Sequence, residues 1–223
     1  MTISVRGIGW LTEREYGCVR RGSRKAFSAG DGVALPNKEL FSYPVKNFGR
    51  FDALSRVTCY AVALALKDAG LTYSSSRKQD IGIIGTSREG SLRSDREYFN
   101  DYLQSGRTLS RGNLFIYTLP SSPLGEAAIH FGFLGPMLYA AGKKDSLAEL
   151  LDTAAEMILA KDAPVMLAGR SEENEGVYFV LDSASATGSG ILCAFSEARP
   201  ILEKGNDVSE TIREMTLLAA RKA

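Results

Sequence analysis

The chain has 223 residues, of which 44% are hydrophobic and 24% charged, a composition typical of an ordinary globular protein. Its 27 basic and 26 acidic residues give a formal net charge of +1, so no global field favours a nucleic acid or a membrane surface as a partner. No apolar run is long enough to span a membrane, and the N-terminus is too short and interrupted for a secretion signal. We therefore expect one domain covering residues 1–223, located in the cytoplasm.

The cysteines and the histidine limit the chemistry that the chain can carry. Cys18, Cys59 and Cys193 are widely spaced and odd in number, which favours reduced thiols over a disulfide framework. Nothing in their spacing indicates a metal site, and we predict neither a metal nor a cofactor. His130 is the only histidine, so a nucleophile that needs a histidine base must use it or borrow a base from elsewhere.

The first part of the chain predicts a strand followed by a long irregular segment. Residues 2–11 are rich in apolar and β-branched residues, which favours a strand. Residues 12–47 contain several glycines and prolines and predict a loop-rich excursion. Within that excursion lies the densest basic cluster, RRGSRK, whose candidates for binding an acidic partner are Arg20, Arg21, Arg24 and Lys25. A solvated basic loop is the alternative interpretation.

The remainder predicts alternating helices and strands. Residues 51–70 repeat apolar side chains at helical spacing, with Asp52 at the start and Gly70 at the end. The further helices predicted by the pattern cover residues 91–104, 124–131, 145–161 and 208–221, the last within a C-terminal segment 207–223. The further strands cover 80–85, 137–141, 164–168, 177–181 and 190–195, the last two spaced like an antiparallel pair. This order favours the α/β class, with a mixed central sheet and helices on both faces.

Several segments in this order resemble the N-terminal half of the β-ketoacyl synthases, in the thiolase-like superfamily. They are RGIGWLT, FGRFDALSRVTCYAVALALKDAGL, IGIIGTSREG, LPSSPLGEAAIHFGFLGPMLYAAG and APVMLAGRSEE. The resemblance covers roughly residues 3–196 and implies a thiolase-like half-fold. It also implies a role connected with 3-oxoacyl-ACP synthases, in fatty-acid or polyketide biosynthesis.

The resemblance also implies that the catalytic machinery is missing. In this family a nucleophilic cysteine occupies the turn between a strand and a buried helix, where the helix dipole favours its thiolate. A gapless overlay of GPMLYAAGKKDSLAELL places Lys144 at that position. An exposed lysine stays protonated and is a poor nucleophile. The family's further catalytic residues lie in its second half, which the chain does not reach.

An enzyme with a displaced nucleophile remains the alternative. Ser146 is the only hydroxyl close to the turn, and its place beside Asp145 also suits the start of a helix. Cys59 lies on the apolar side of its helix and fits a core position. We expect His130 to be structural or exposed, because its position is not a catalytic one in the family. The alternative function is thus an acyltransferase or thioesterase using Lys144 or Ser146.

Two further patterns concern partners. Asp145, Glu149, Asp152 and Glu156 form one acidic stripe on the helix 145–161, with the apolar side chains on the opposite side. That stripe predicts a face in contact with water or with a polar partner. In the family, the strand equivalent to 137–141 pairs across a twofold axis, so we predict dimerisation through Met137, Leu138, Tyr139 and Ala140.

These predictions together favour a catalytically inactive, synthase-like subunit. We expect a homodimer or a heterodimer with an active synthase, and an acyl carrier protein as a possible further partner through the basic cluster. A remnant with a new binding role, unrelated to acyl chains, is the third possibility.

Overall fold

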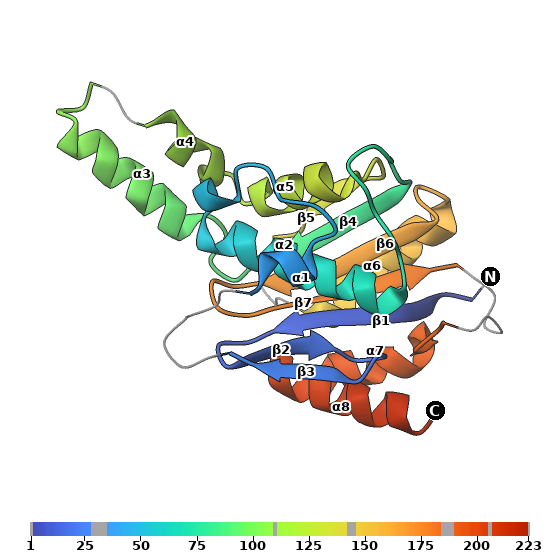
Figure 1. Ribbon diagram of the computed structural model, residues 1–223. Coiled ribbons are helices and arrows are strands. Elements are labelled where there is room, and N and C mark those ends of the chain that lie inside the picture. The colour runs from blue at the N-terminus through green and yellow to red at the C-terminus, as the bar shows by residue number, and fades with distance from the viewer. Residues whose placement is uncertain are drawn as a thin grey trace.

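The computed structural model describes residues 2–27, 35–108, 111–141, 146–183, 190–204 and 207–222 (Figure 1). The strands are β1 (Ser4–Leu11), β2 (Glu15–Cys18), β3 (Ser23–Ala26), β4 (Ile81–Thr86), β5 (Met137–Tyr139), β6 (Val165–Ser171), β7 (Gly176–Asp182) and β8 (Cys193–Ala194). The α-helices are α1 (Asn37–Leu40), α2 (Ala53–Ala69), α3 (Leu92–Gln104), α4 (Gly112–Phe115), α5 (Ser122–Phe131), α6 (Leu147–Ala160), α7 (Phe195–Lys204) and α8 (Val208–Ala220). Two 3-10 turns, η1 (Phe48–Arg50) and η2 (Ile116–Thr118), complete the described elements.

One mixed sheet organises these elements, in the order β3-β2-β1-β7-β6-β4-β5, with β8 paired to β1. The strand β4 runs parallel to β5 and β6, whereas the pairs formed by β1, β2, β3 and β7 are antiparallel. Helices α2 and α5 cover one face of the sheet, and α6, α7 and α8 cover the other (Figure 1). The predicted class, α/β with helices on both faces of a mixed sheet, is confirmed.

Helix α2 lies almost directly on β1 because β1 carries glycines where the two backbones meet. A Cβ atom at Gly9 would lie 2.0 Å from the main-chain nitrogen of Ala65, and one at Gly7 would lie 2.3 Å from that of Ala69. Only a residue without a side chain permits such a close approach. The N-cap Asp52 accepts a hydrogen bond from the main-chain nitrogen of Ser55, and Gly70 ends α2 in the left-handed conformation, as predicted.

Two expectations require correction. The segment 12–47 is not wholly irregular, since β2 and β3 form an antiparallel hairpin in its first part. The strand around Cys193 does not pair with β7, because β6 and β1 already occupy both edges of β7. It pairs instead with Ser4 and Val5 at the N-terminal end of β1. The strand β2 pairs with the C-terminal end of β1, at Gly9–Leu11, and leaves these residues free for β8. The helix α7, which follows directly, was not predicted.

An arm formed by α3, α4 and η2 projects from the body at the upper left of Figure 1. The main packing partners of α3 are α4 and η2 rather than the sheet. Ser94 is the only buried residue of α3. No helix in the described part of the chain is both long and apolar enough to cross a membrane.

Candidate functional site

The carboxyl ends of the parallel strands β4, β5 and β6 lie side by side, and hydroxyl groups gather there. Thr86 donates from Oγ1 to the carbonyl of Ala140 over 2.7 Å, which fixes the chain just after β5. The Tyr139 hydroxyl donates to the carbonyl of Ser87 over 3.1 Å. The carboxyl ends of parallel strands are the usual place for a ligand in an open α/β sheet.

The space at these strand ends is nevertheless small. The hollow bounded by Thr86, Tyr139 and Tyr178 has a volume of about 10 Å³. A cavity of that size holds at most one water molecule. The described residues that bound this hollow are therefore closely packed.

Of the two candidate nucleophiles near the turn, only Ser146 lies among the described residues. Lys144 lies outside the described residues, so its prediction is untested. Ser146 is the N-cap of α6, and its hydroxyl accepts a hydrogen bond from the main-chain nitrogen of Glu149 at 3.4 Å. His130 belongs to α5, on the opposite face of the sheet from α6, where it packs against buried Phe41 and Phe131. The structure does not bring Ser146 and His130 together.

The three cysteines are free and buried, as expected for reduced core thiols. Burial raises the pKa of Cys18 to about 11 and that of Cys193 to about 12. The pKa of Cys59, which has no exposed surface, is raised still further by the same cause. A thiol that stays protonated at neutral pH is a weak nucleophile. These cysteines are core residues.

As the sequence predicted, the described residues of α6 divide into a buried apolar side and a polar side. Its apolar side chains Leu147, Leu150, Leu151, Ala154 and Ile158 are buried in the core under the sheet. Glu149 and Glu156 are exposed. Asp152 pairs instead with Arg199 of α7, at 2.8 Å. The acidic stripe is thus shared between solvent and a helix of the same chain, while Asp145 lies outside the described residues.

The basic cluster divides into structural and exposed members. Main-chain nitrogens of Arg20 and Arg21 donate to the buried Asp68 carboxylate at 2.9 and 2.8 Å. Their side-chain Nε atoms donate to the carbonyls of Asp68 and Lys67. Both carbonyls belong to the last turn of α2, and that of Lys67 also accepts from the main-chain nitrogen of Gly70 at 3.2 Å. Arg20 and Arg21 therefore cap α2, a role that the sequence did not reveal.

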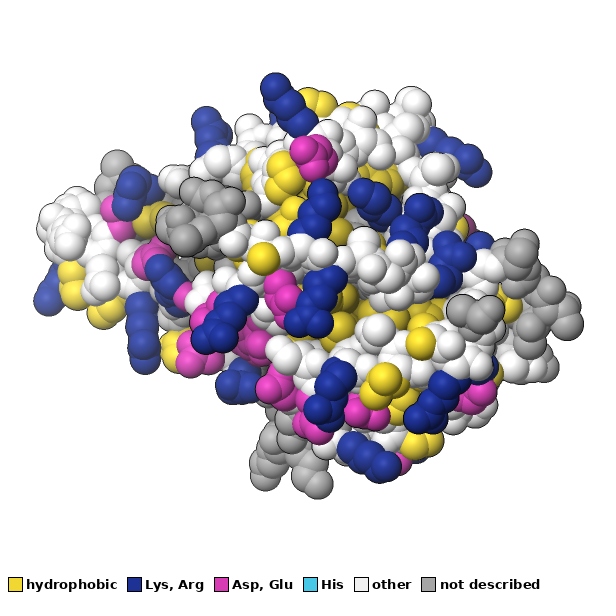
Figure 2. All heavy atoms as spheres, turned by 60° about the horizontal axis from the view of Figure 1, so that its bottom comes forward, with side chains coloured by type: hydrophobic (Ala, Val, Ile, Leu, Met, Phe, Trp, Pro, Cys, Tyr) yellow, Lys and Arg dark blue, Asp and Glu magenta, His cyan; other side chains and the backbone are white. Residues whose placement is uncertain are grey.

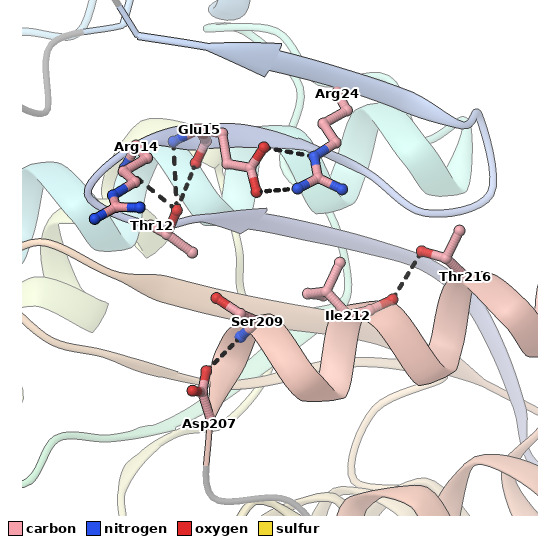
Figure 3. Close-up of polar contacts among 8 residues, drawn as sticks. All are labelled: Thr12, Arg14, Glu15, Arg24, Asp207, Ser209, Ile212 and Thr216. Carbon is pink, nitrogen blue, oxygen red and sulfur yellow. Dashed lines mark hydrogen bonds and ion pairs between the residues drawn. The ribbon is translucent and has the colours of Figure 1, made fainter.

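The other two members of the cluster lie on the edge strand β3. Arg24 makes a two-pronged pair with Glu15 across the hairpin (Figure 3). Lys25 pairs with Glu39 of α1 at 3.6 Å. Figure 2 shows basic side chains interspersed with acidic ones and small apolar areas on the face that it brings forward. This face carries a mixed charge pattern rather than one broad basic field.

Exposed apolar side chains are concentrated on β5, at the other edge of the sheet, and on the elements that precede it in the chain. Twelve large hydrophobic side chains are well exposed in the described residues, and ten of them fall between residues 92 and 138. The ten are Leu92, Phe99, Leu103, Phe115, Ile116, Leu119, Ile129, Leu134, Met137 and Leu138. They belong to the arm, to α5, to the turn after it and to β5. We call this set the β5 face.

A cavity of about 440 Å³ lies between the base of the arm and the start of α2. Phe51, Leu114 and Tyr117 supply apolar lining, and Arg93 on its wall pairs with Glu97 and Glu173. The Tyr117 hydroxyl donates to Glu126 at 3.3 Å, and burial raises the pKa of Glu126. No pattern in the sequence indicated this cavity, because its walls come from four separate segments.

Comparisons with known proteins agree with this architecture. The family model "Beta-ketoacyl synthase, N-terminal domain" matches residues 12–199. The solved ishigamide ketosynthase/chain length factor has a TM-score of 0.61 and 18% identity over 87% of this chain and 65% of that chain. The ketosynthase ApeO in complex with its chain length factor ApeC, from Xenorhabdus doucetiae, gives a TM-score of 0.57 and 14% identity over 83% and 81%.

A third solved structure holds a type II polyketide-synthase acyl-carrier protein in complex with its ketosynthase, AntDE:AntF, bound to the hexaketide. It gives a TM-score of 0.53 and 14% identity over 82% of this chain and 58% of that chain. At sequence identities this low, the similarity to these structures supports a shared fold and nothing more. No protein with a curated description matches the chain. The chain spans less than two thirds of the ishigamide and AntDE:AntF chains that it matches.

Proposed function

The chain belongs to the family of β-ketoacyl synthase N-terminal domains, and from that premise we propose that it is a non-catalytic, chain-length-type subunit that pairs with an active ketosynthase. The observation that carries the proposal is the β5 face. Ile129 and Leu134 are 75% and 68% exposed, and Met137 and Leu138 of β5 are 46% and 44% exposed. Exposed apolar side chains on and beside an edge strand are typical of a protein interaction site.

The two edges of the sheet support β5 as the pairing strand. The edge strand β3 carries Arg24 and Lys25, and charged side chains on an edge oppose strand addition. The opposite edge strand, β5, carries Met137, Leu138 and Tyr139 and no charge. An uncovered apolar edge favours association, whereas a charged one disfavours it. We infer that a second subunit adds at β5 and also contacts the arm.

The described chemistry supports a subunit without its own nucleophile. The hydroxyl of Ser146 is engaged in capping α6, the cysteine thiols are buried, and the strand ends near Thr86 are packed. Solved relatives include a ketosynthase in complex with its chain length factor and one in complex with an acyl-carrier protein. We extend both kinds of partner to this chain as part of the proposal, with fatty-acid or polyketide-type biosynthesis as the setting.

Co-expression with a ketosynthase from the same genome tests the pairing. We expect the two chains to co-purify and to sediment as a 1:1 complex. Leu138→Arg should abolish co-purification, because a buried unpaired charge at an interface is costly. Leu217→Arg is the matched control, since Leu217 of α8 is similarly exposed, at 48%, but lies outside the β5 face. Equal behaviour of the two variants, or no complex with the unsubstituted chain, would contradict the proposal.

Acyl transfer to the chain tests the absence of a nucleophile. The purified protein is incubated with acyl-CoA and with acyl-carrier protein, and its intact mass is measured. We expect no adduct. A covalent acyl group mapped to Lys144 or Ser146 would instead establish an acyltransferase or thioesterase with a displaced nucleophile.

A further inference from the structure

A groove lies on the surface between the β2–β3 hairpin, α1 and the C-terminal half of α2. It is near the edge of the sheet opposite to β5. It consists of two hollows, of about 310 and 120 Å³, which share Arg21, Glu39, Leu40 and Lys67 in their walls. We call it the α1–α2 groove. The larger hollow is of a size typical of small-ligand sites, and the smaller approaches the roughly 150 Å³ of a cavity that accommodates benzene.

Apolar side chains line the interior of the groove. The smaller hollow contains Leu35, Leu40 and Leu64, and the larger contains Phe41 and Leu71. Leu35 and Leu64 are almost fully buried, whereas Leu40 and Leu71 are half-buried. The groove therefore offers apolar contact to a chain that enters from the surface. Burial of such a chain is favourable by about 0.8 kcal/mol per methylene.

Cations surround the point where the two hollows meet. Arg21 is held there by the bond from its Nε atom to the Lys67 carbonyl at 2.7 Å. Lys67 and Lys25 are exposed on the walls, and Lys67 forms no ion pair with any residue that the structure describes. Among the residues that the structure describes, Glu39 is the one carboxylate in the walls of either hollow, and it pairs with Lys25. Beneath them, the Asp68 carboxylate is occupied by three main-chain N–H groups.

We propose that the α1–α2 groove binds an anion with an unbranched apolar tail, of the class of medium-chain fatty carboxylates. The tail fits the leucine-lined hollows, and the carboxylate fits between Lys67, Lys25 and Arg21. A carboxylate in an apolar groove needs such partners, since an unpaired buried charge is costly. The Lys25–Glu39 pair is exposed at both ends and is therefore weak, so an incoming carboxylate can displace Glu39.

The groove is separate from the β5 face, so this inference goes beyond the proposed pairing with a ketosynthase. The test titrates the purified chain with hexanoate, octanoate and decanoate below their micellar concentrations, by calorimetry and by the amide NMR shifts of Gly17, Leu40 and Leu64. We expect Kd to fall by up to about fourfold per added methylene until the hollows are filled. Decylamine, of equal length and opposite charge, should bind at least tenfold more weakly than decanoate.

Variants separate the charge from the tail. The double change Lys25→Glu with Lys67→Glu should weaken decanoate binding at least tenfold. Lys38→Glu with Lys46→Glu alters the net charge equally at exposed positions outside the groove walls and should have little effect. Glu39→Gln should tighten binding a few-fold, because it removes the competing carboxylate. Leu40→Trp should fill the part of the groove where the two hollows meet and block binding. Circular dichroism shows whether this variant is folded.

Equal effects of the two lysine pairs would overturn the proposal, because decanoate would then be responding to net charge alone. Binding that survives Leu40→Trp in a folded variant would also overturn it. Retention on anionic phosphatidylglycerol vesicles without binding of monomeric decanoate would assign the cations to a lipid surface and overturn the small-ligand site. Arg21 is left unchanged in all variants, since it also caps α2.

Discussion

His130 is a buried imidazole enclosed by aromatic rings. It is 6% exposed and lies against Phe41, Tyr43, Tyr73 and Phe131, with ring centres 4.5–5.8 Å away. Its Nε2 atom has no hydrogen-bond partner among the described residues. Burial lowers the pKa of His130 from an ordinary 6.5 to about 4. Of the two expectations from the sequence, a structural or an exposed histidine, the burial of His130 agrees with the first.

This burial predicts a pH-dependent stability. The folded state keeps His130 neutral down to about pH 4, whereas the unfolded chain takes up the proton below about pH 6.5. The unfolded state then binds more protons, so stability falls as the pH drops from about 6.5 to about 4, by up to about 1.4 kcal/mol per pH unit. Urea unfolding of the unsubstituted chain and of His130→Leu across this range measures the difference, and parallel stability curves would contradict the expectation.

Asp68 connects three segments through one carboxylate. It is fully buried, and it accepts hydrogen bonds from the main-chain nitrogens of Ile8, Arg20 and Arg21 at 2.8–2.9 Å. Burial raises the pKa of Asp68, and these N–H groups act in the opposite direction. The carboxylate therefore joins α2 to β1 and to the turn of the β2–β3 hairpin.

We expect Asp68→Asn to lower the free energy of unfolding by about 3 kcal/mol. The substitution replaces one carboxylate oxygen by an NH₂ group, which is a donor and cannot accept a hydrogen bond from the main-chain N–H groups around it. Chemical unfolding measures this change. Asp152→Asn is the matched control, since Asp152 pairs with Arg199 in a partly exposed position and should lose less than about 1 kcal/mol. Similar losses in the two variants would show that the three main-chain bonds are unimportant.

At the scale of elements, the packing of α2 on β1 depends on the absence of side chains in β1. Gly9 permits this close contact because it has no Cβ atom. A Cβ atom there would clash with the main-chain nitrogen of Ala65, at a distance of 2.0 Å. The neighbour is main chain in a buried helix, so it cannot move aside alone. The glycines of the motif RGIGWLT, one of the segments that resemble the family, are thus needed for this close helix–strand contact.

Gly9→Ala should destabilise the chain by about 3 kcal/mol, because the whole of α2 must shift to admit a methyl group. Gly49→Ala is the control, since a Cβ at Gly49 meets nothing within 4 Å, and it should change stability by less than about 0.5 kcal/mol. Thermal or urea unfolding measures both variants. A tolerated Gly9→Ala would mean that α2 sits less tightly on β1 than described.

At the scale of the whole molecule, the arm packs mainly on itself in the part of the chain that the structure describes. Helix α3 packs mainly on α4 and η2, and it exposes Phe99 at 58%. Few buried contacts permit local opening well below the global unfolding energy. A subunit that covers the β5 face should also supply the contacts that the arm lacks.

Hydrogen exchange tests this view of the arm. We expect the amides of α3 to exchange at least tenfold faster than those of β6 and β7 in the isolated chain, because β6 and β7 are buried at the centre of the sheet. Binding of the partner ketosynthase should slow exchange in α3 and leave β7 unchanged. Equal protection of α3 and β7 in the isolated chain would contradict the description of a weakly supported arm.

Local patterns in the sequence determined much of this protein. Helical periodicity with Asp52 and Gly70 placed α2, and the spacing of leucines on α6 determined which side is buried. The order of its segments along the chain indicated the family. These features depend on residues close together in the chain, where period, capping and turn chemistry act directly.

Only the tertiary structure decided the features that join distant residues. It placed the strand at Cys193 beside β1, because both edges of β7 were occupied. It showed that Arg20 and Arg21 cap α2 and that Lys67 joins Arg21 in the wall of a groove. It also showed that the apolar side chains of β5 and of α5 beside it are exposed rather than buried. Such contacts depend on strand order and packing between remote segments, which no local period of the sequence encodes.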